Sequence, residues 1–181
     1  MYWTCVISGV SLPDTPLITA AVEYAQRFCE PYLFNHSMRS WLFAAKIAHA
    51  KAIDCDQEVV AVGTILHDIG LASSVSGSNR FEVDGANAVR SFVKERGLSD
   101  RRAQLIWDLV ALNSTASIAL HKEAEVAVGT MGIGLDYGGF GFDSISTADV
   151  NEIVAQFPRL KMKNKFAEAC SHLVTTRPET S

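Results

Sequence analysis

The chain has 181 residues, of which 48% are hydrophobic and 20% charged, a composition that indicates one globular domain and excludes an intrinsically disordered chain. Its net charge of −4 argues against nucleic acid as a partner, because phosphate binding requires a basic surface. No apolar run approaches the roughly 18 residues of a membrane helix, and no Lys or Arg precedes Arg27, so we expect a cytoplasmic protein without a signal peptide or membrane contact.

Apolar residues recur at helical spacing through most of the chain, and no segment alternates as a strand would. The first helix is predicted at 14–29, where a capping residue precedes a proline and a second proline ends the helix. A second helix is predicted at about 35–51. Asp56 is expected to cap a third, whose apolar run leads to His67 and which ends at Gly70.

The second half of the chain continues this pattern. A polar loop is expected at 73–80, and helices are predicted at about 82–96, 100–112, 122–135, 146–157 and 163–173. The glycine-rich segment 138–141 is not a phosphate loop, since no Lys-Ser/Thr follows it. The tail 174–181 is expected to be flexible. The sequence therefore predicts an all-α fold of seven to eight helices in a single domain, 1–181.

The four cysteines are scattered along the chain and form no CxxC pair. This arrangement indicates neither a zinc ribbon nor a redox motif, and we expect reduced thiols packed in or near the core.

The adjacent pair His67-Asp68 follows an apolar run that includes Ile65 and Leu66, which predicts a place at the edge of the core. A carboxylate there is costly unless a positive charge neutralises it. A divalent cation with imidazole and carboxylate ligands would do so, and such ligands suit zinc, iron or manganese. The alternative is a helix-terminal histidine in a salt bridge with an aspartate, which is the commoner meaning of a lone His-Asp dipeptide.

Two further residues accompany this pair: His36 in the string NHSMR, and Asp136 near the end of the helix at 122–135. The order His…His-Asp…Asp resembles the HD-domain superfamily of helical metalloenzymes. The strings NHSMR, LHDIG, RFEVDGA and GLDYGG together resemble its cyanamide hydratase-like branch, over about 33–166.

The resemblance implies that His36, His67, Asp68 and Asp136 are the ligands of one divalent metal, with zinc favoured and iron or manganese as alternatives. Such a metal lowers the pKa of a bound water toward about 7, which produces hydroxide at neutral pH. In that branch, hydroxide attacks the nitrile carbon of cyanamide and the product is urea. The resemblance therefore implies a metal-dependent lyase acting on cyanamide or a similar nitrile, with Asp68 taking part in catalysis.

Two neighbouring polar residues have both a catalytic and a structural interpretation. Asn35 could hydrogen-bond the substrate or the metal-bound water, or it could cap its helix. Glu82 matches a family position near the pocket, where it could shuttle protons or orient His67. It could equally be a first-turn glutamate favoured by the helix dipole.

Arg39 lies one turn after His36 and is expected to neutralise Asp68 or Asp136 rather than to contact an anion directly. Phe43 and Phe81 are candidates to line the substrate pocket, although aromatic residues at helical spacing are more often core residues.

This chain departs from the family pattern at 112–115, where relatives commonly carry a histidine and this sequence reads Leu-Asn-Ser-Thr. Asn113 offers a donor and an acceptor but is a poor metal ligand, so the departure disfavours a two-metal site. Asn113 and Ser114 are expected to bind the substrate or support the metal ligands.

Three functions follow from these residues. The leading one is a hydratase acting on a small molecule. The second is an HD-type phosphohydrolase acting on a nucleotide or phosphate ester, which would need more cationic side chains than Arg39, Lys46 and Arg80 provide. The third is an inactive metal-binding interaction module, for which Asn113 is the main support.

The apolar composition is compatible with a homo-oligomer.

Overall fold

The computed structural model describes residues 6–7, 10–11 and 13–180. Within that range the regular elements are helices, as predicted, apart from a short antiparallel hairpin of β1 (Val6–Ile7) and β2 (Val10–Ser11) that the sequence did not predict. The helices are α1 (Pro16–Phe28), α2 (Pro31–Ala50), α3 (Gln57–Ile65), η1 (Ile69–Leu71), α4 (Phe81–Lys94), α5 (Asp100–Ala111), α6 (Ala116–Ala119), α7 (Ala124–Gly138), η2 (Phe142–Ser144), α8 (Thr147–Gln156), α9 (Met162–Thr176) and η3 (Pro178–Thr180).

Three of the predicted helix starts are confirmed by side-chain caps. The Thr15 hydroxyl accepts a hydrogen bond from the Ile18 amide in front of α1. Asp56 accepts from the amides of Glu58 and Val59 at the start of α3, and Ser146 accepts from the Asp149 amide at the start of α8. Each cap satisfies a backbone donor that the first turn of a helix leaves without a partner.

Other helix boundaries differ from the prediction. Helix α2 begins at Pro31, because proline fits the first helical position and does not have to end the preceding structure. Helix α3 ends at Ile65, so His67 and Asp68 lie in the turn before η1 and not in the helix itself. Helix α9 extends to Thr176 and η3 covers Pro178–Thr180, so the last helix ends later than the predicted residue 173.

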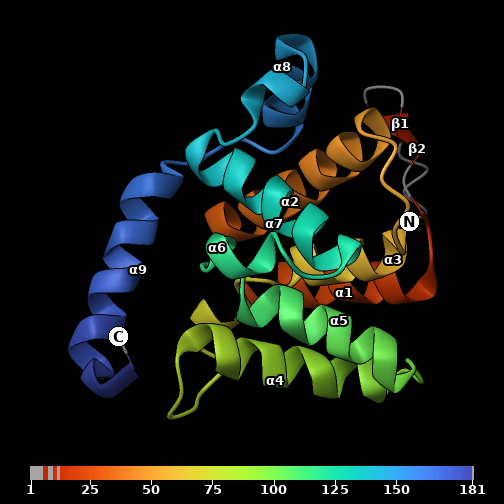
Figure 1. Ribbon diagram of the computed structural model, residues 1–181. Coiled ribbons are helices and arrows are strands. Elements are labelled where there is room, and N and C mark those ends of the chain that lie inside the picture. The colour runs from red at the N-terminus through yellow and green to blue at the C-terminus, as the bar shows by residue number, and fades with distance from the viewer. Residues whose placement is uncertain (1–5, 8–9, 12, 181) are drawn as a thin grey trace.

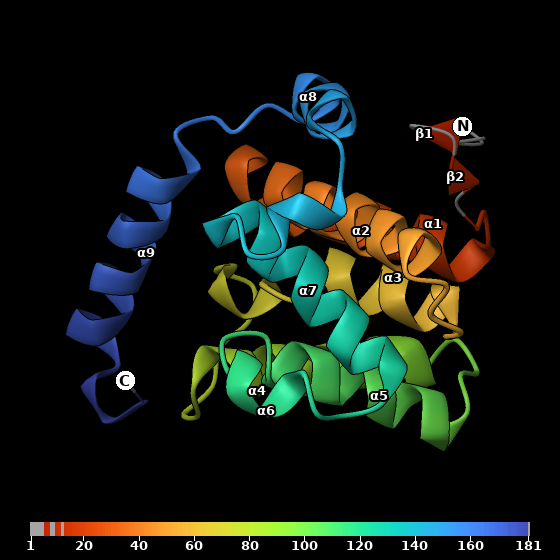
Figure 2. The same ribbon diagram turned by 45° about the horizontal axis from the view of Figure 1, so that its top comes forward.

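The helices are arranged in layers. Helices α4 and α5 lie side by side at one edge of the molecule, while α2 and α7 cross its centre with α3 beside them (Figures 1 and 2). Helix α8 lies on the side of α2 away from α4 and α5, and α9 runs along the flank. The predicted metal ligands therefore belong to the central helices and the turn next to them.

The helices α2 and α7 approach closely at Gly132. A Cβ atom at this position would overlap the Ser40 carbonyl oxygen and the Ala44 amide nitrogen. One turn from this contact, His36 on α2 and Asp136 on α7 face each other. The absence of a side chain at Gly132 thus permits the close packing of α2 and α7 that brings these two predicted site residues together.

A second close approach positions the His67-Asp68 turn. Gly70 follows this turn, and a Cβ atom there would overlap the carbonyl oxygen of Phe81 at the start of α4. Glu82, the next residue on α4, is thereby brought to the same cavity as His67.

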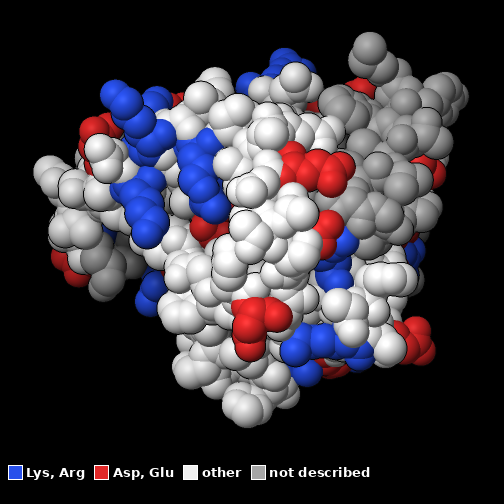
Figure 3. Space-filling view, turned by 90° about the horizontal axis from the view of Figure 1, so that it is seen from above, with Lys and Arg blue, Asp and Glu red and all other residues white. Residues whose placement is uncertain are grey.

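On the face seen in Figure 3, acidic and basic side chains are both present, some of them next to one another, and other residues cover much of the surface between them. Among the described helices, none is both long enough and apolar enough to cross a membrane.

Candidate metal centre

Three buried side chains converge at the centre of the molecule. His36 on α2 is 1% exposed, and His67 and Asp68 in the turn after α3 are 1% and 2% exposed. The two Nε2 atoms are 3.2 Å apart. Asp68 Oδ2 lies 3.0 Å from Nε2 of His67 and 3.6 Å from Nε2 of His36. Three atoms that commonly bind metals therefore share one small volume.

The hydrogen bonds on the far side of each ring determine which atoms carry protons. His67 Nδ1 lies 2.8 Å from the Thr64 carbonyl oxygen, which can only accept, so Nδ1 is the donor. His36 Nδ1 lies 2.7 Å from a carboxylate oxygen of Asp136 and donates for the same reason. In the neutral rings, both Nε2 atoms therefore present lone pairs to each other and to Asp68.

The charges of the three groups agree with this description. Burial dominates for His36 and lowers its pKa, so the ring is neutral near pH 7. Burial also acts on His67, but the neighbouring Asp68 carboxylate outweighs it and raises the pKa of His67. Burial would raise the pKa of Asp68, yet His67 and then His36 hold it below its usual value. Without a metal, His67 and Asp68 are thus suited to share a proton.

A divalent cation fits this arrangement. Asp68 Oδ2 is buried and forms no hydrogen bond of good geometry with any described residue, although it lies close to His67. A cation would neutralise the repulsion among the three lone-pair atoms and replace the proton between His67 and Asp68. Two imidazoles and one carboxylate suit zinc, iron or manganese, and leave positions open for water and substrate.

Asp136, the fourth predicted ligand, lies apart from these three atoms. Its Oδ2 contacts Nδ1 of His36, on the side of the ring opposite Nε2. Arg39 donates to both carboxylate oxygens, at 2.8 Å from Nε and 2.7 Å from Nη2. Arg39 therefore pairs with Asp136, one of the two carboxylates that it was expected to neutralise.

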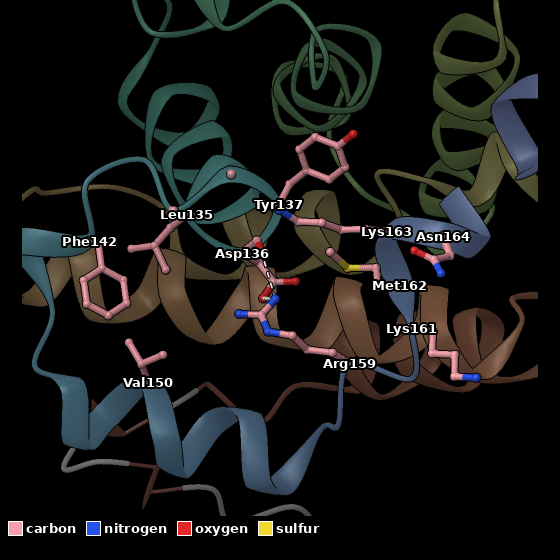
Figure 4. A pocket seen from close by; sticks show the side chains of 12 residues that line it. Leu135, Asp136, Tyr137, Phe142, Val150, Arg159, Lys161, Met162, Lys163 and Asn164 are labelled. Atoms are coloured by element: carbon pink, nitrogen blue, oxygen red, sulfur yellow. Dashed lines mark hydrogen bonds and ion pairs between the residues drawn. The ribbon is translucent and has the colours of Figure 1, made fainter. Parts of the chain in front are cut away.

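Arg159, in the segment between α8 and α9, makes a further contact with Asp136. Its Nη1 donates to Oδ1 and to the backbone carbonyl, both at 3.0 Å (Figure 4). Burial alone would raise the pKa of Asp136, but hydrogen bonds from His36 and Arg39 hold it well below its usual range. The carboxylate is thus ionised and fully bonded at neutral pH.

His36, His67 and Asp68 line a cavity of about 470 Å³. Most of its wall is apolar or aromatic, with contributions from Phe81, Ile133, Tyr137, Phe140 and Phe166. Phe81, a predicted pocket residue, lines this cavity. The polar part of the wall includes Glu82, Asn113, Ser114 and Thr130.

Glu82 is 2% exposed and accepts two strong hydrogen bonds at Oε1. The donors are Ser114 Oγ at 2.6 Å and Arg80 Nη2 at 2.8 Å. Burial favours a raised pKa for Glu82, but these two hydrogen bonds outweigh it and lower the pKa. Glu82 is therefore ionised near pH 7, and it faces the cavity without contacting His67.

Asn113 supports the His67-Asp68 turn directly. Its Nδ2 donates to the His67 backbone carbonyl at 2.9 Å and to the Val110 carbonyl at 3.0 Å. Both amide protons of Asn113 are thereby used on the backbone, and its carbonyl oxygen is the group left for a ligand in the cavity.

Two predicted site residues are placed elsewhere. The Asn35 amide donates to the Pro158 carbonyl at 2.9 Å, and Asn35 does not line the cavity, because it faces the segment between α8 and α9. It does not cap α2 either, since that helix begins at Pro31. Phe43 has no exposed surface and packs in the main hydrophobic core, away from the cavity.

The sequence did not single out Arg159 or Thr130. Arg159 falls within the range 33–166 of the family resemblance but in none of the strings that carry it. The negative charge of Asp136 was the signal for a second arginine. Thr130 lies on α7, and its buried hydroxyl has no hydrogen-bond partner among the described residues. Nothing in the sequence distinguished this threonine from a core residue.

Comparison with known proteins agrees with this geometry. No curated protein sequence matches the chain significantly. A family model described as the HD domain matches residues 33–129, more than half of the chain, and this segment contains His36, His67 and Asp68. The chain belongs to the HD domain family.

Proposed function

We propose that this protein is a metal-dependent hydratase that adds water to a small, neutral, nitrile-like compound such as cyanamide. Members of the HD family act mostly as metal-dependent hydrolases, and family membership does not distinguish a lyase from a hydrolase. The residues around the metal ligands provide the argument for this choice.

The observation that carries the proposal is the charge of the cavity. Arg80 is the one Lys or Arg side chain among its described lining residues, and its guanidinium is bonded to Glu82. A phosphate ester needs cationic groups that stabilise charge on the transferred phosphoryl group. The apolar walls favour an uncharged substrate instead, and so does the pairing of the Arg80 charge with Glu82.

His36, His67 and Asp68 would hold the divalent ion. When bound, that ion supplies a water whose pKa is lowered toward about 7, which is a nucleophile at neutral pH. Addition of water to a nitrile forms a carbon–oxygen bond and transfers two protons from oxygen to nitrogen. The protein therefore needs a group that accepts a proton near the metal and returns it to the substrate.

Glu82 is placed for this proton transfer. Its carboxylate is ionised, faces the cavity and is held in one orientation by Ser114 and Arg80. Its Oε2 has only the longer contact of 3.3 Å from Arg80 Nε, so this oxygen is the better placed to take a proton. In this proposal Glu82 accepts a proton from water and donates it to the substrate nitrogen.

Two other groups are available to hold the substrate. The unpartnered hydroxyl of Thr130 can donate a hydrogen bond, and the Asn113 side-chain oxygen can accept one from an amino group. The aromatic side chains of the wall offer apolar contacts to an uncharged substituent of the substrate. A cavity of about 470 Å³ exceeds the size of cyanamide, which leaves room for a larger organic substituent.

The test is an assay of the purified protein loaded separately with zinc, iron(II) and manganese(II). We expect urea from cyanamide, or an amide from a larger nitrile. Glu82→Gln should lower kcat by about 10²- to 10⁴-fold, the usual contribution of a proton-transfer group. Asp84→Asn on the same helix is the control, since Asp84 does not line the cavity.

The same preparation should be tested with nucleotides and a generic phosphate ester. Hydrolysis of these compounds, abolished by His67→Ala, would favour the phosphohydrolase instead. A fully metal-loaded protein that converts neither class would contradict the hydratase and favour a non-catalytic metal-binding module.

A further inference from the structure

Asp136 has no bonding capacity left for a metal. Its side chain accepts four hydrogen bonds, from His36 Nδ1, Arg39 Nε, Arg39 Nη2 and Arg159 Nη1. We propose that Asp136 is a positioning residue that acts on the metal through His36, and that the protein ligands are His36, His67 and Asp68 alone. This inference rests on the metal site of the proposed function but not on its substrate.

The geometry of the imidazole ring separates Asp136 from the metal. Nδ1 and Nε2 point away from opposite edges of the ring, and Asp136 occupies the Nδ1 side at 2.7 Å. The other two ligand atoms, on His67 and Asp68, lie on the Nε2 side. Asp136 could join them only by abandoning His36.

Electrostatics also keep Asp136 in place. Arg39 has no exposed surface, and the Asp136 carboxylate is its one acidic partner among the described residues. Moving the carboxylate to a metal would leave this buried guanidinium without an acidic partner, which is strongly destabilising. Arg159 adds a second cation, and both it and Asp136 line a neighbouring cavity (Figure 4).

The family match does not decide whether Asp136 binds the metal, because the matched residues end at 129 and Asp136 lies beyond them. The contact between Asp136 and Nδ1 of His36 indicates a supporting role for this carboxylate. A carboxylate on Nδ1 fixes the tautomer and ring orientation of a metal-binding histidine and makes Nε2 a better donor. Loss of such a partner typically weakens metal affinity by about 10- to 100-fold, whereas loss of a ligand costs more.

The experiment compares Asp136→Asn with Asp68→Asn. Zinc affinity is measured for each purified variant by competition with a chromophoric chelator, and folding of the metal-free proteins is checked by circular dichroism. We expect Asp136→Asn to bind one zinc ion with affinity reduced by about 10- to 100-fold, and Asp68→Asn to lose considerably more. Equal losses in the two variants would overturn the inference.

A second measurement on the wild-type protein covers the case in which Asp136→Asn does not fold. In a crystal structure with zinc bound, we expect Asp136 to remain on His36 Nδ1. An Asp136 oxygen at about 2.0–2.2 Å from zinc, the usual ligand distance, would overturn the inference.

The two proposals fail in distinguishable ways. If the metal-loaded protein forms neither urea from cyanamide nor an amide from a larger nitrile, the hydratase is contradicted and the affinity ratios of the variants are unaffected. Wild-type protein with no affinity for zinc, iron(II) or manganese(II) would overturn both.

Discussion

Replacing Arg39 by methionine should destabilise the protein strongly, because it leaves a buried carboxylate short of its main partner. Arg39 has no exposed surface, and it forms a bidentate pair with Asp136 and donates to the Phe157 carbonyl at 2.8 Å. Methionine keeps much of the side-chain volume, so the change removes charge and hydrogen bonds rather than packing.

Breaking a buried ion pair by removing one partner costs about 3–5 kcal/mol. We expect the lower end, about 3 kcal/mol, because His36 and Arg159 continue to donate to Asp136. For a chain of this size, the melting temperature should then fall by about 6–12 °C.

The assay is urea unfolding of the metal-free protein, followed by circular dichroism at pH 7. Arg101→Met is the matched control, since Arg101 is 66% exposed and also pairs with a carboxylate, that of Glu123. An exposed pair contributes about 0–1 kcal/mol. Equal losses of unfolding free energy in the two variants would refute the argument that the buried pair holds α2, α7 and the 157–159 segment together.

Three further predictions concern the metal and the packing of the helices. Zinc at about 100 times its dissociation constant should stabilise the wild-type protein by about 2.7 kcal/mol in thermal unfolding, and His67→Ala should remove this effect. Zinc affinity should fall as the pH drops through the raised pKa of His67, because protonated His67 cannot bind a metal. Since this pKa is raised, the fall in affinity should begin above the ordinary histidine pKa of about 6.5. An affinity unchanged between pH 8 and pH 5 would exclude His67 as a ligand. Gly132→Ala should cost about 1–3 kcal/mol in urea unfolding, because its Cβ atom would overlap the backbone of α2. Gly134→Ala, for which the nearest atom lies at 3.5 Å, should be neutral or stabilising by up to about 1 kcal/mol, and a similar loss in both variants would contradict the close approach.

The helices of this fold follow closely from local patterns in the sequence. Thr15 before Pro16, Asp56 before an apolar run and Ser146 three residues before Asp149 are short-range signals, and each one marks an observed helix start. The first helix ends before Pro31, as predicted, but the second begins at Pro31 and not near residue 35, because proline also fits the first position of a helix. The β1–β2 hairpin has strands of two residues each, too short for an alternating pattern to be visible.

The residue types of the site were predictable, but the directions of their side chains were not. His36, His67 and Asp68 meet as expected because their motifs lie at a helix and a turn that pack together. Asp136 faces Nδ1 of His36 because Gly132 sets how closely α7 packs on α2, and that packing has no local signal. Asn35, next to His36 in sequence, points about one third of a turn away and therefore bonds to Pro158.

The most direct test of the metal centre is the number of divalent ions bound per chain. The wild-type protein should be stripped with a chelator, reloaded with zinc, dialysed and analysed by elemental mass spectrometry together with His67→Ala and His121→Ala. We predict one zinc ion per chain in the wild type and in His121→Ala, and none in His67→Ala. No bound ion in the wild type, two ions per chain, or full occupancy in His67→Ala would contradict a single metal held by His36, His67 and Asp68.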